Sequence, residues 1–188
     1  THRNYPTPKI LEMLQRYRVS SVYADDETLL SIKHVTPTLG TPLSLFLRSL
    51  AMRGNPLTQE DIDWCKQTLN VTPNETFGST EIGQVLGNSH LKWPVRTGSL
   101  GRAYPGHAVA ILDDYGTPVS AGTVGELALN RLDQHEHPDP ALFQGFWRQP
   151  SLTDEAFSGE WFRSGIFARM DEDGYYWPAD KPSGSRPE

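Results

Sequence analysis

The sequence is short of cysteine, and this shortage limits its covalent chemistry. Cys65 is the only cysteine among 188 residues. A single cysteine excludes an intramolecular disulfide and is compatible with a reducing compartment, so we expect a cytoplasmic protein. Ile62, Trp64 and Leu69 surround Cys65 with the spacing of a helix face. This pattern predicts a buried thiol rather than a nucleophile.

Long apolar runs and an excess of basic residues are also missing. No stretch is apolar and uncharged for long enough to span a membrane, and the segment Thr1 to Pro6 has no apolar core of a secretory signal. The chain carries 17 Lys and Arg against 23 Asp and Glu, a net charge of −6. Phosphate neutralisation needs clustered basic residues, so we expect no nucleic-acid partner.

The first half of the chain has the pattern of an α/β layer. Residues 19–24 and 45–52 are rich in β-branched and apolar residues, and we expect two strands there, the first of them buried. Thr58 is a suitable N-cap with Asp61 three residues later, which predicts a helix that runs to about residue 70. Residues 71–76 then form an extended segment. Strand, helix and strand in this order indicate a parallel sheet with crossover helices.

The second half has short β-rich runs separated by turn residues, a pattern typical of an all-β unit. The expected runs include residues 108–112, 124–129, 142–147, 160–163, 167–170 and 175–177. The predicted fold is therefore α/β, with the end of a parallel layered sheet in residues 1–100 and a small β-barrel-like subdomain in residues 101–179. Residues 180–188 contain two prolines, a glycine and serines, and are expected to be a tail or linker.

A loop with binding chemistry lies between these halves, in the segment Asn-Glu-Thr-Phe-Gly-Ser-Thr-Glu of residues 74–81. A chain that turns at Gly78 comes close to a ligand, because glycine has no Cβ. Ser79 and Thr80 offer hydroxyl groups, and Glu81 offers the hard oxygen ligand that Mg²⁺ prefers. Phe77 adds a flat apolar face. The combination suits a nucleoside triphosphate with its metal ion.

Motifs along nearly the whole chain resemble, in the same order, those of the adenylate-forming superfamily of acyl-CoA synthetases, luciferase-type enzymes and peptide-synthetase adenylation domains. They stand at residues 53–57, 74–81, 98–106, 125–127, 145–147, 161–165 and 173–177. Within the superfamily, the chain is most similar to acetyl- and medium-chain acyl-CoA synthetases. The resemblance implies an acid–thiol ligase that adenylates a carboxylic acid with ATP and then transfers the acyl group to coenzyme A.

The resemblance also implies roles for individual residues. Phe77 would lie against adenine, Thr80 would reach phosphate, and Glu81 would hold Mg²⁺; Thr80 and Glu81 are the implied catalytic residues. Gly54 would let adenine approach the backbone, and Gly78 would do the same near the acyl group. The implied nucleotide-binding positions are Gly54, Asn55, Phe77, Gly78, Ser79, Thr80 and Ile166.

The chain departs from the family pattern at several places. Ile166 stands where the family has an aspartate that binds the ribose hydroxyls, and losing a charge-assisted hydrogen bond costs about 1.5–3 kcal/mol. Asn55 replaces the usual glutamate. Nothing here matches the family's phosphate loop or its lysine-bearing C-terminal domain. Two hypotheses remain: a segment of an AMP-forming ligase, or a non-catalytic remnant that serves as a binding or interaction domain.

Two further features have alternative interpretations. His135, Glu136 and His137, with Asp133 and Asp139 beside them, invite a metal site, but their spacing fits no standard zinc pattern, so we expect a solvated turn. Residue 163 is an arginine that suits either a phosphate contact or a surface ion pair.

Overall fold

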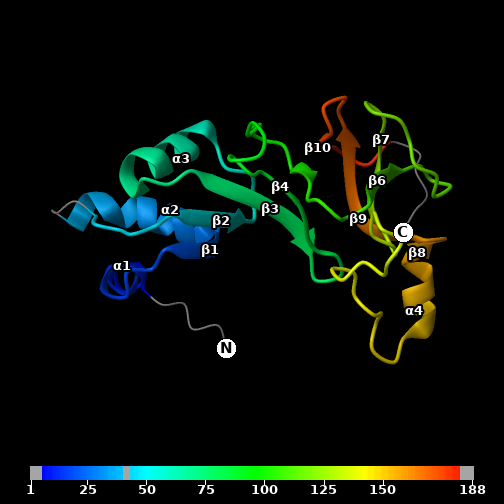
Figure 1. The fold of residues 1–188 in the computed structure, drawn as a ribbon, viewed down its shortest axis with the longest axis horizontal. Coiled ribbons are helices and arrows are strands. Elements are labelled where there is room, and N and C mark those ends of the chain that lie inside the picture. Colours follow the sequence, from blue (N-terminus) through cyan, green and yellow to red (C-terminus); the bar gives the residue numbers. More distant parts are fainter. Residues whose placement is uncertain (1–5, 40–42, 183–188) are drawn as a thin grey trace. The chain divides into compact units, whose positions relative to one another are not determined.

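The computed structural model describes residues 6–39 and 43–182, which fall into two compact units (Figure 1). The first unit comprises the residues up to Glu75 together with Ser89–Thr97, and the second comprises Thr76–Asn88 and the residues from Gly98 onward. Residues 76–88, which the sequence analysis placed in the first part, thus belong to the second unit. Of the expected tail, residues 183–188 lie outside the described residues, as do residues 1–5 of the expected first part.

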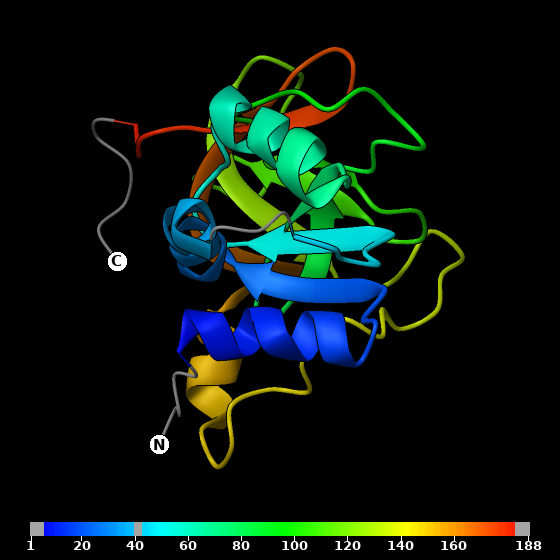
Figure 2. The same ribbon diagram turned by 90° about the vertical axis from the view of Figure 1, so that its left-hand side faces the viewer.

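The first unit contains a short parallel sheet and its helices. Strands β1 and β2 pair in parallel and run side by side in both ribbon views, and β2 pairs in parallel with the first residues of β3 (Figures 1 and 2). Its elements are α1 (Thr7–Arg16), β1 (Ser21–Asp25), α2 (Asp26–Val35), η1 (Thr36–Leu39), β2 (Ser49–Arg53), α3 (Gln59–Trp64), η2 (Cys65–Leu69) and the start of β3 (Pro73–Ser79). The expected parallel α/β layer is confirmed.

Local capping interactions set where the helices begin. Thr58 accepts a hydrogen bond from the backbone of Asp61, whose side chain in turn accepts one from the backbone of Thr58, the reciprocal pattern that the sequence predicts. Asp25 caps α2 by accepting a hydrogen bond of 2.9 Å from the backbone nitrogen of Thr28. After η2, Asn70 adopts a left-handed conformation with φ of 54° and ends the helical segment.

The expectation of a buried first strand is wrong. Strand β1 stands at the end of the strand order and pairs with β2 alone among the described strands. Tyr23 in its centre is 54% exposed. Apolar and β-branched composition predicts a strand but does not say whether a second strand covers its edge.

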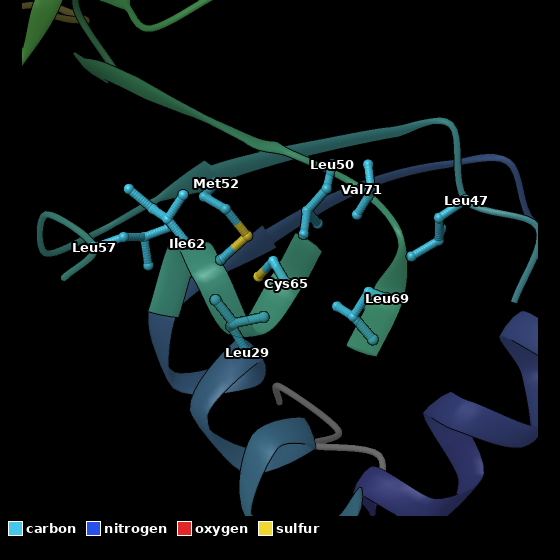
Figure 3. Packing of buried hydrophobic residues seen from close by; sticks show 9 residues of the cluster. All are labelled: Leu29, Leu47, Leu50, Met52, Leu57, Ile62, Cys65, Leu69 and Val71. Atoms are coloured by element: carbon cyan, nitrogen blue, oxygen red, sulfur yellow. The ribbon is translucent and has the colours of Figure 1, made fainter. Parts of the chain in front are cut away.

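The core of the first unit surrounds Cys65, which is fully buried (Figure 3). Its buried members are Leu29, Leu47, Leu50, Met52, Leu57, Ile62, Cys65, Leu69 and Val71. Burial raises the pKa of the Cys65 thiol to about 12, so the thiolate is scarce at neutral pH. The predicted burial of the thiol is confirmed.

The second unit is an antiparallel sheet in the order β3-β4-β5-β10-β9-β7-β6, with β8 paired to β9. The sheet is open, with β3 and β6 at the ends of this order. Its further elements are β4 (Gly83–Gly87), β5 (Gly101–Ala103), β6 (Val109–Leu112), β7 (Val124–Asn130), α4 (Pro150–Glu155), β8 (Phe157–Ser158), β9 (Trp161–Met170) and β10 (Tyr175–Pro178). The α/β fold class with a following β unit is confirmed.

Three of the expected strands differ from the structure. The runs at residues 160–163 and 167–170 join into the single long strand β9, and the run at residues 142–147 forms no strand. In the latter segment Phe143 stacks edge-on against Phe146 and Phe162, with ring centroids 4.9 and 5.2 Å apart. Aromatic residues there fill space beside the sheet instead of pairing with it.

Candidate functional site

The loop singled out in the sequence spans both units. Asn74 and Glu75 lie in the part of β3 that belongs to the first unit, and both brace its backbone. The Asn74 side-chain oxygen accepts a hydrogen bond of 2.9 Å from the backbone nitrogen of His90, and Glu75 accepts one of 2.6 Å from the backbone nitrogen of Leu57. These two residues therefore shape the chain around the loop.

Gly78 does not turn the chain, which corrects the sequence expectation. It lies within β3 opposite Gln84 of β4, beside an irregularity in the register, and the turn follows at residues 80–82. A Cβ on Gly78 would lie 1.5 Å from the backbone oxygen of Gly83. The close approach of the two strands thus requires glycine here, independently of any ligand.

Glu81 lies in the turn between β3 and β4 and is held by its neighbours. The Ser79 hydroxyl donates a hydrogen bond of 2.6 Å to Glu81 Oε2, and the Glu81 backbone nitrogen donates one of 3.2 Å to the Ser79 hydroxyl. Glu81 is half-buried and Thr80 is exposed. No side chain in the described part of the chain binds Glu81 Oε1, so one carboxylate oxygen remains available to a ligand.

This donor set fits a magnesium ion. Ser79, Thr80 and Glu81 present two hydroxyl groups and a carboxylate within three residues, and Mg²⁺ usually binds one or two carboxylates while keeping water or phosphate oxygens as its other ligands. Residues 6–39 and 43–182 contain no group of three or more His, Cys, Asp or Glu side chains that could hold a metal by themselves. A metal at Glu81 would therefore be completed by water and substrate oxygens.

Phe77 precedes this turn and is half-buried. It packs against the core cluster of the second unit, which includes Ile82, Val85 and Leu86. Its ring thus has apolar contacts on the protein side, and part of it remains accessible.

Gly54 and Asn55 lie in the first unit, in the exposed turn after β2. Gly54 has a φ of +112°, and a Cβ there would lie 2.2 Å from Asp26 Oδ1. Asn55 donates a hydrogen bond of 2.8 Å from its side-chain nitrogen to Asp26 Oδ2. Asn55 therefore binds the start of α2, Gly54 lies close to it, and glycine is required at position 54 by backbone conformation as well as by space.

Ile166 lies at a bulge in β9. Between the pairs Ala128–Arg163 and Glu126–Phe167, strand β9 has three residues where β7 has one. The glycine at the centre of the bulge, residue 165, has a φ of +74°. Ile166 itself is half-buried. Bulges redirect side chains relative to a regular strand, so the orientation at position 166 is set by the bulge.

A buried carboxylate holds this bulge in place. Glu126 is 8% exposed and accepts a hydrogen bond of 2.8 Å from the backbone nitrogen of Gly165 and one of 2.6 Å from Arg163 Nε, with Arg163 Nη2 also in contact. The Ser164 hydroxyl donates a hydrogen bond of 2.6 Å to the backbone oxygen of Leu127. Arg163 thus forms an ion pair, which was one of the two alternatives expected from the sequence. The pair is largely buried, whereas a surface pair was expected.

Sequence reasoning missed the role of Glu126, which it recorded only as part of a motif. The available signal was an acidic residue inside a run of strand-forming residues, at 124–129. A charge in such a position is either exposed or paired, and here it is paired.

The acidic and histidine-rich segment divides into two parts. Asp133 accepts hydrogen bonds of 2.7 and 2.9 Å from the backbone nitrogens of His135 and His137, and these bonds hold the pKa of Asp133 below its ordinary value. That part is the expected solvated turn. Asp139 is different: it is 4% exposed, and its Oδ2 lies 2.8 Å from Nδ1 of His107. The expectation that Asp139 is solvated is wrong.

None of the helices formed by the described residues is both long and apolar enough to cross a membrane.

Residues 2–132 match the family described as AMP-binding enzyme. This match covers more than half of the chain, which therefore belongs to that family, and the resemblance seen in the sequence is confirmed.

Individual relatives agree with this assignment. The chain is 29% identical to the uncharacterized acyl-CoA ligase YtcI of Bacillus subtilis. The alignment covers 94% of this chain and 32% of YtcI. The structure of an acyl-CoA synthetase from Brucella canis aligns with a TM-score of 0.81 and 27% identity, covering 96% of this chain and 32% of the other. An O-succinylbenzoate coenzyme A synthetase (MenE) of B. subtilis, in complex with ATP and magnesium, aligns with a TM-score of 0.78 and 18% identity over 98% of this chain and 37% of the other, which shows the shared fold. The chain thus spans about one third of the length of these proteins.

Proposed function

We propose that this chain is part of an AMP-forming acyl-CoA ligase and contributes the turn that binds the magnesium complex of ATP. The observation that supports this most is the Glu81 turn: an acid that accepts a hydrogen bond from Ser79 at one carboxylate oxygen and follows the exposed residue Thr80. A remnant without nucleotide chemistry has no need of a preorganised metal ligand at this position. Membership of the AMP-binding family supplies the ligand class.

In the proposed reaction a carboxylic acid oxygen attacks the α-phosphorus of ATP, the bond to pyrophosphate breaks, and the thiol of coenzyme A then displaces AMP from the acyl carbon. In this reaction Glu81 would bind Mg²⁺, which neutralises developing charge on the phosphate oxygens. Thr80 would donate a hydrogen bond to a phosphate oxygen, and Phe77 would contact adenine. The substrates of the whole protein are thus ATP, a carboxylic acid and coenzyme A.

The second candidate is a non-catalytic binding or interaction domain, and Ile166 favours it. An isoleucine side chain accepts no hydrogen bond, so the acceptor for ribose hydroxyls that the resemblance implies is absent at this position. The Glu81 turn and Ile166 therefore support opposite hypotheses, and measuring nucleotide binding separates them.

Calorimetric titration of ATP, with and without Mg²⁺, into the chain and into Glu81→Gln tests the proposal. We expect Mg²⁺-dependent binding by the unaltered chain and a loss of about tenfold or more in Glu81→Gln, since a charge-assisted contact contributes about 1.5–3 kcal/mol. Glu172→Gln is the matched control, because Glu172 is exposed in the hairpin before β10 and the variant has the same change of charge. Absence of binding by the unaltered chain would favour the non-catalytic candidate, and equal affinity in both variants would remove Glu81 from the site.

A further inference from the structure

A buried carboxylate outside the proposed site stabilises a turn next to it. The side chain of Asp139 is 0% exposed, and its two oxygens have separate partners: Oδ2 lies 2.8 Å from His107 Nδ1, and Oδ1 accepts a hydrogen bond of 2.8 Å from the backbone nitrogen of Ala141. The backbone nitrogen of Asp139 donates to the oxygen of Arg131 at 2.8 Å, and its backbone oxygen accepts from Leu142 at 3.2 Å. A buried carboxylate is tolerated only when its oxygens are bonded, so this network holds residues 139–142 in one conformation.

Ala141 and Phe143, at the end of this segment, contact the turn that carries Glu81 and the residue after it. The backbone nitrogen of Phe143 donates a hydrogen bond of 2.7 Å to the backbone oxygen of Glu81. The Cβ of Ala141 lies 3.2 Å from the position that a Cβ would take on Gly83, the residue that follows the turn. A displacement of residues 139–143 therefore shifts the Glu81 backbone or breaks its hydrogen bond.

We propose that His107 and Asp139 are positioning residues for Glu81, acting through residues 139–143. The proposal rests on the proposed function, because it assigns to this pair the orientation of the proposed magnesium ligand. Carboxylate oxygens accept hydrogen bonds, so the tautomer of His107 that carries its proton on Nδ1 would supply the donor to Asp139. Mg²⁺ requires near-ideal octahedral geometry, and partners that orient a metal ligand typically change metal affinity by about 10- to 100-fold.

The test compares His107→Leu with His107→Asn in the whole chain. Asparagine places an amide N–H near the position of Nδ1 and so keeps the donor to Asp139, whereas leucine removes it. Two quantities are measured: hydrogen exchange of the Phe143 amide by NMR, and the Mg²⁺-dependent affinity for ATP by calorimetry. His135→Leu is the control, because His135 is an exposed histidine of the neighbouring turn.

We expect His107→Leu to exchange the Phe143 amide about tenfold faster and to bind Mg²⁺–ATP about tenfold more weakly. His107→Asn should restore both quantities, and His135→Leu should change neither. Unchanged exchange in His107→Leu would overturn the proposal, as would faster exchange with unaltered affinity, since the pair would then be only structural.

The two proposals fail in different ways. If the unaltered chain binds no ATP, the proposed function fails, and amide exchange alone decides whether the pair controls the turn. Faster exchange in His107→Leu that His107→Asn reverses would then support the positioning of Glu81, and no change would overturn it.

Discussion

The ion pairs of Lys33 in the first unit and of Glu126 in the second serve different purposes. In the first unit Lys33 of α2 donates hydrogen bonds of 2.7 Å to Glu60 and 2.8 Å to Asp61 of α3, and so joins two helices whose backbones already have their own hydrogen bonds. In the second unit Glu126 accepts a hydrogen bond from the backbone nitrogen of Gly165. This glycine lies in the bulge of β9 and has no paired residue on β7. Lys33 thus connects two regular elements, whereas Glu126 stabilises irregular backbone.

Gly78 of the proposed loop and Gly54 of the first unit differ in what lies next to them. Gly54 faces a side chain, Asp26, whereas Gly78 faces the backbone of Gly83. A side chain has rotamers through which it can move aside, but a paired strand has no such freedom. Motif residues of the second unit thus constrain the shape of the sheet, in addition to any part they have in binding.

The largest expected effect is at Gly78. Gly78→Ala places a Cβ 1.5 Å from the Gly83 oxygen, so β3 and β4 must separate, and we expect a loss of about 3 kcal/mol or more in the free energy of unfolding. Gly159→Ala is the control: its φ is +59° but nothing lies within 4 Å of the added Cβ, so it should cost only the backbone penalty of about 1–2 kcal/mol. Urea denaturation measures both. Equal losses of unfolding free energy in Gly78→Ala and Gly159→Ala would contradict the close approach of β3 and β4.

A smaller effect is expected from Arg163→Met. The change leaves the buried Glu126 with the Gly165 amide as its remaining partner among those described, and we expect a loss of about 2–3 kcal/mol, below the usual 3–5 because the Arg163 side chain is 26% exposed. Arg169→Met, an exposed position on the same strand, should change stability by less than about 0.5 kcal/mol. Similar denaturation midpoints for both variants would show that the bulge does not depend on the ion pair.

The smallest effect is expected in the first unit, from Lys33→Met. The pair with Asp61 is about as buried as the Arg163 pair, with side chains 25% and 11% exposed, but Asp61 keeps hydrogen bonds from the backbone nitrogen and the hydroxyl of Thr58 when Lys33 is removed, so we expect a loss of about 1 kcal/mol. Lys66→Met removes a more exposed pair with Asp63, at 3.7 Å, and should cost less than about 0.5 kcal/mol. A loss in Lys33→Met as large as in Arg163→Met would remove the contrast between the units.

The pH dependence of the Lys33→Met deficit follows from the pKa values of the pair. Burial alone raises the pKa of Asp61, but hydrogen bonds from Lys33 and Thr58 outweigh it and hold the pKa below the ordinary value of 3.8. The contribution of Asp61 to the free energy of unfolding is therefore present above pH 3.8, and it is lost as the pH falls through the lowered pKa. The hydrogen bond to Asp61 raises the pKa of Lys33 above 10.5, so its contribution is present below that pH and is lost as the pH rises through the raised value. The loss of unfolding free energy in Lys33→Met should therefore be constant around neutral pH and become smaller at strongly acidic and at strongly basic pH.

Local sequence was sufficient where the interaction is local. Thr58 and Asp61 are three residues apart, and their reciprocal cap appears as predicted. The helical spacing around Cys65 predicted its burial, because a helix face is defined by neighbours three and four residues away. The motif order likewise identified the family without any coordinates.

Only the tertiary structure decided the features that join distant residues. His107 and Asp139 are 32 residues apart, and Glu126 and Gly165 are 39 apart. Gly78 lies inside a strand, where the sequence predicted a turn, because the backbone of Gly83 lies against it. Such contacts depend on strand register and on a bulge, and a shift of one residue in either would exchange the two faces of the strand. Local propensity located helix α3 and most of the strands, whereas the register between strands determined which charges are buried and what they hold.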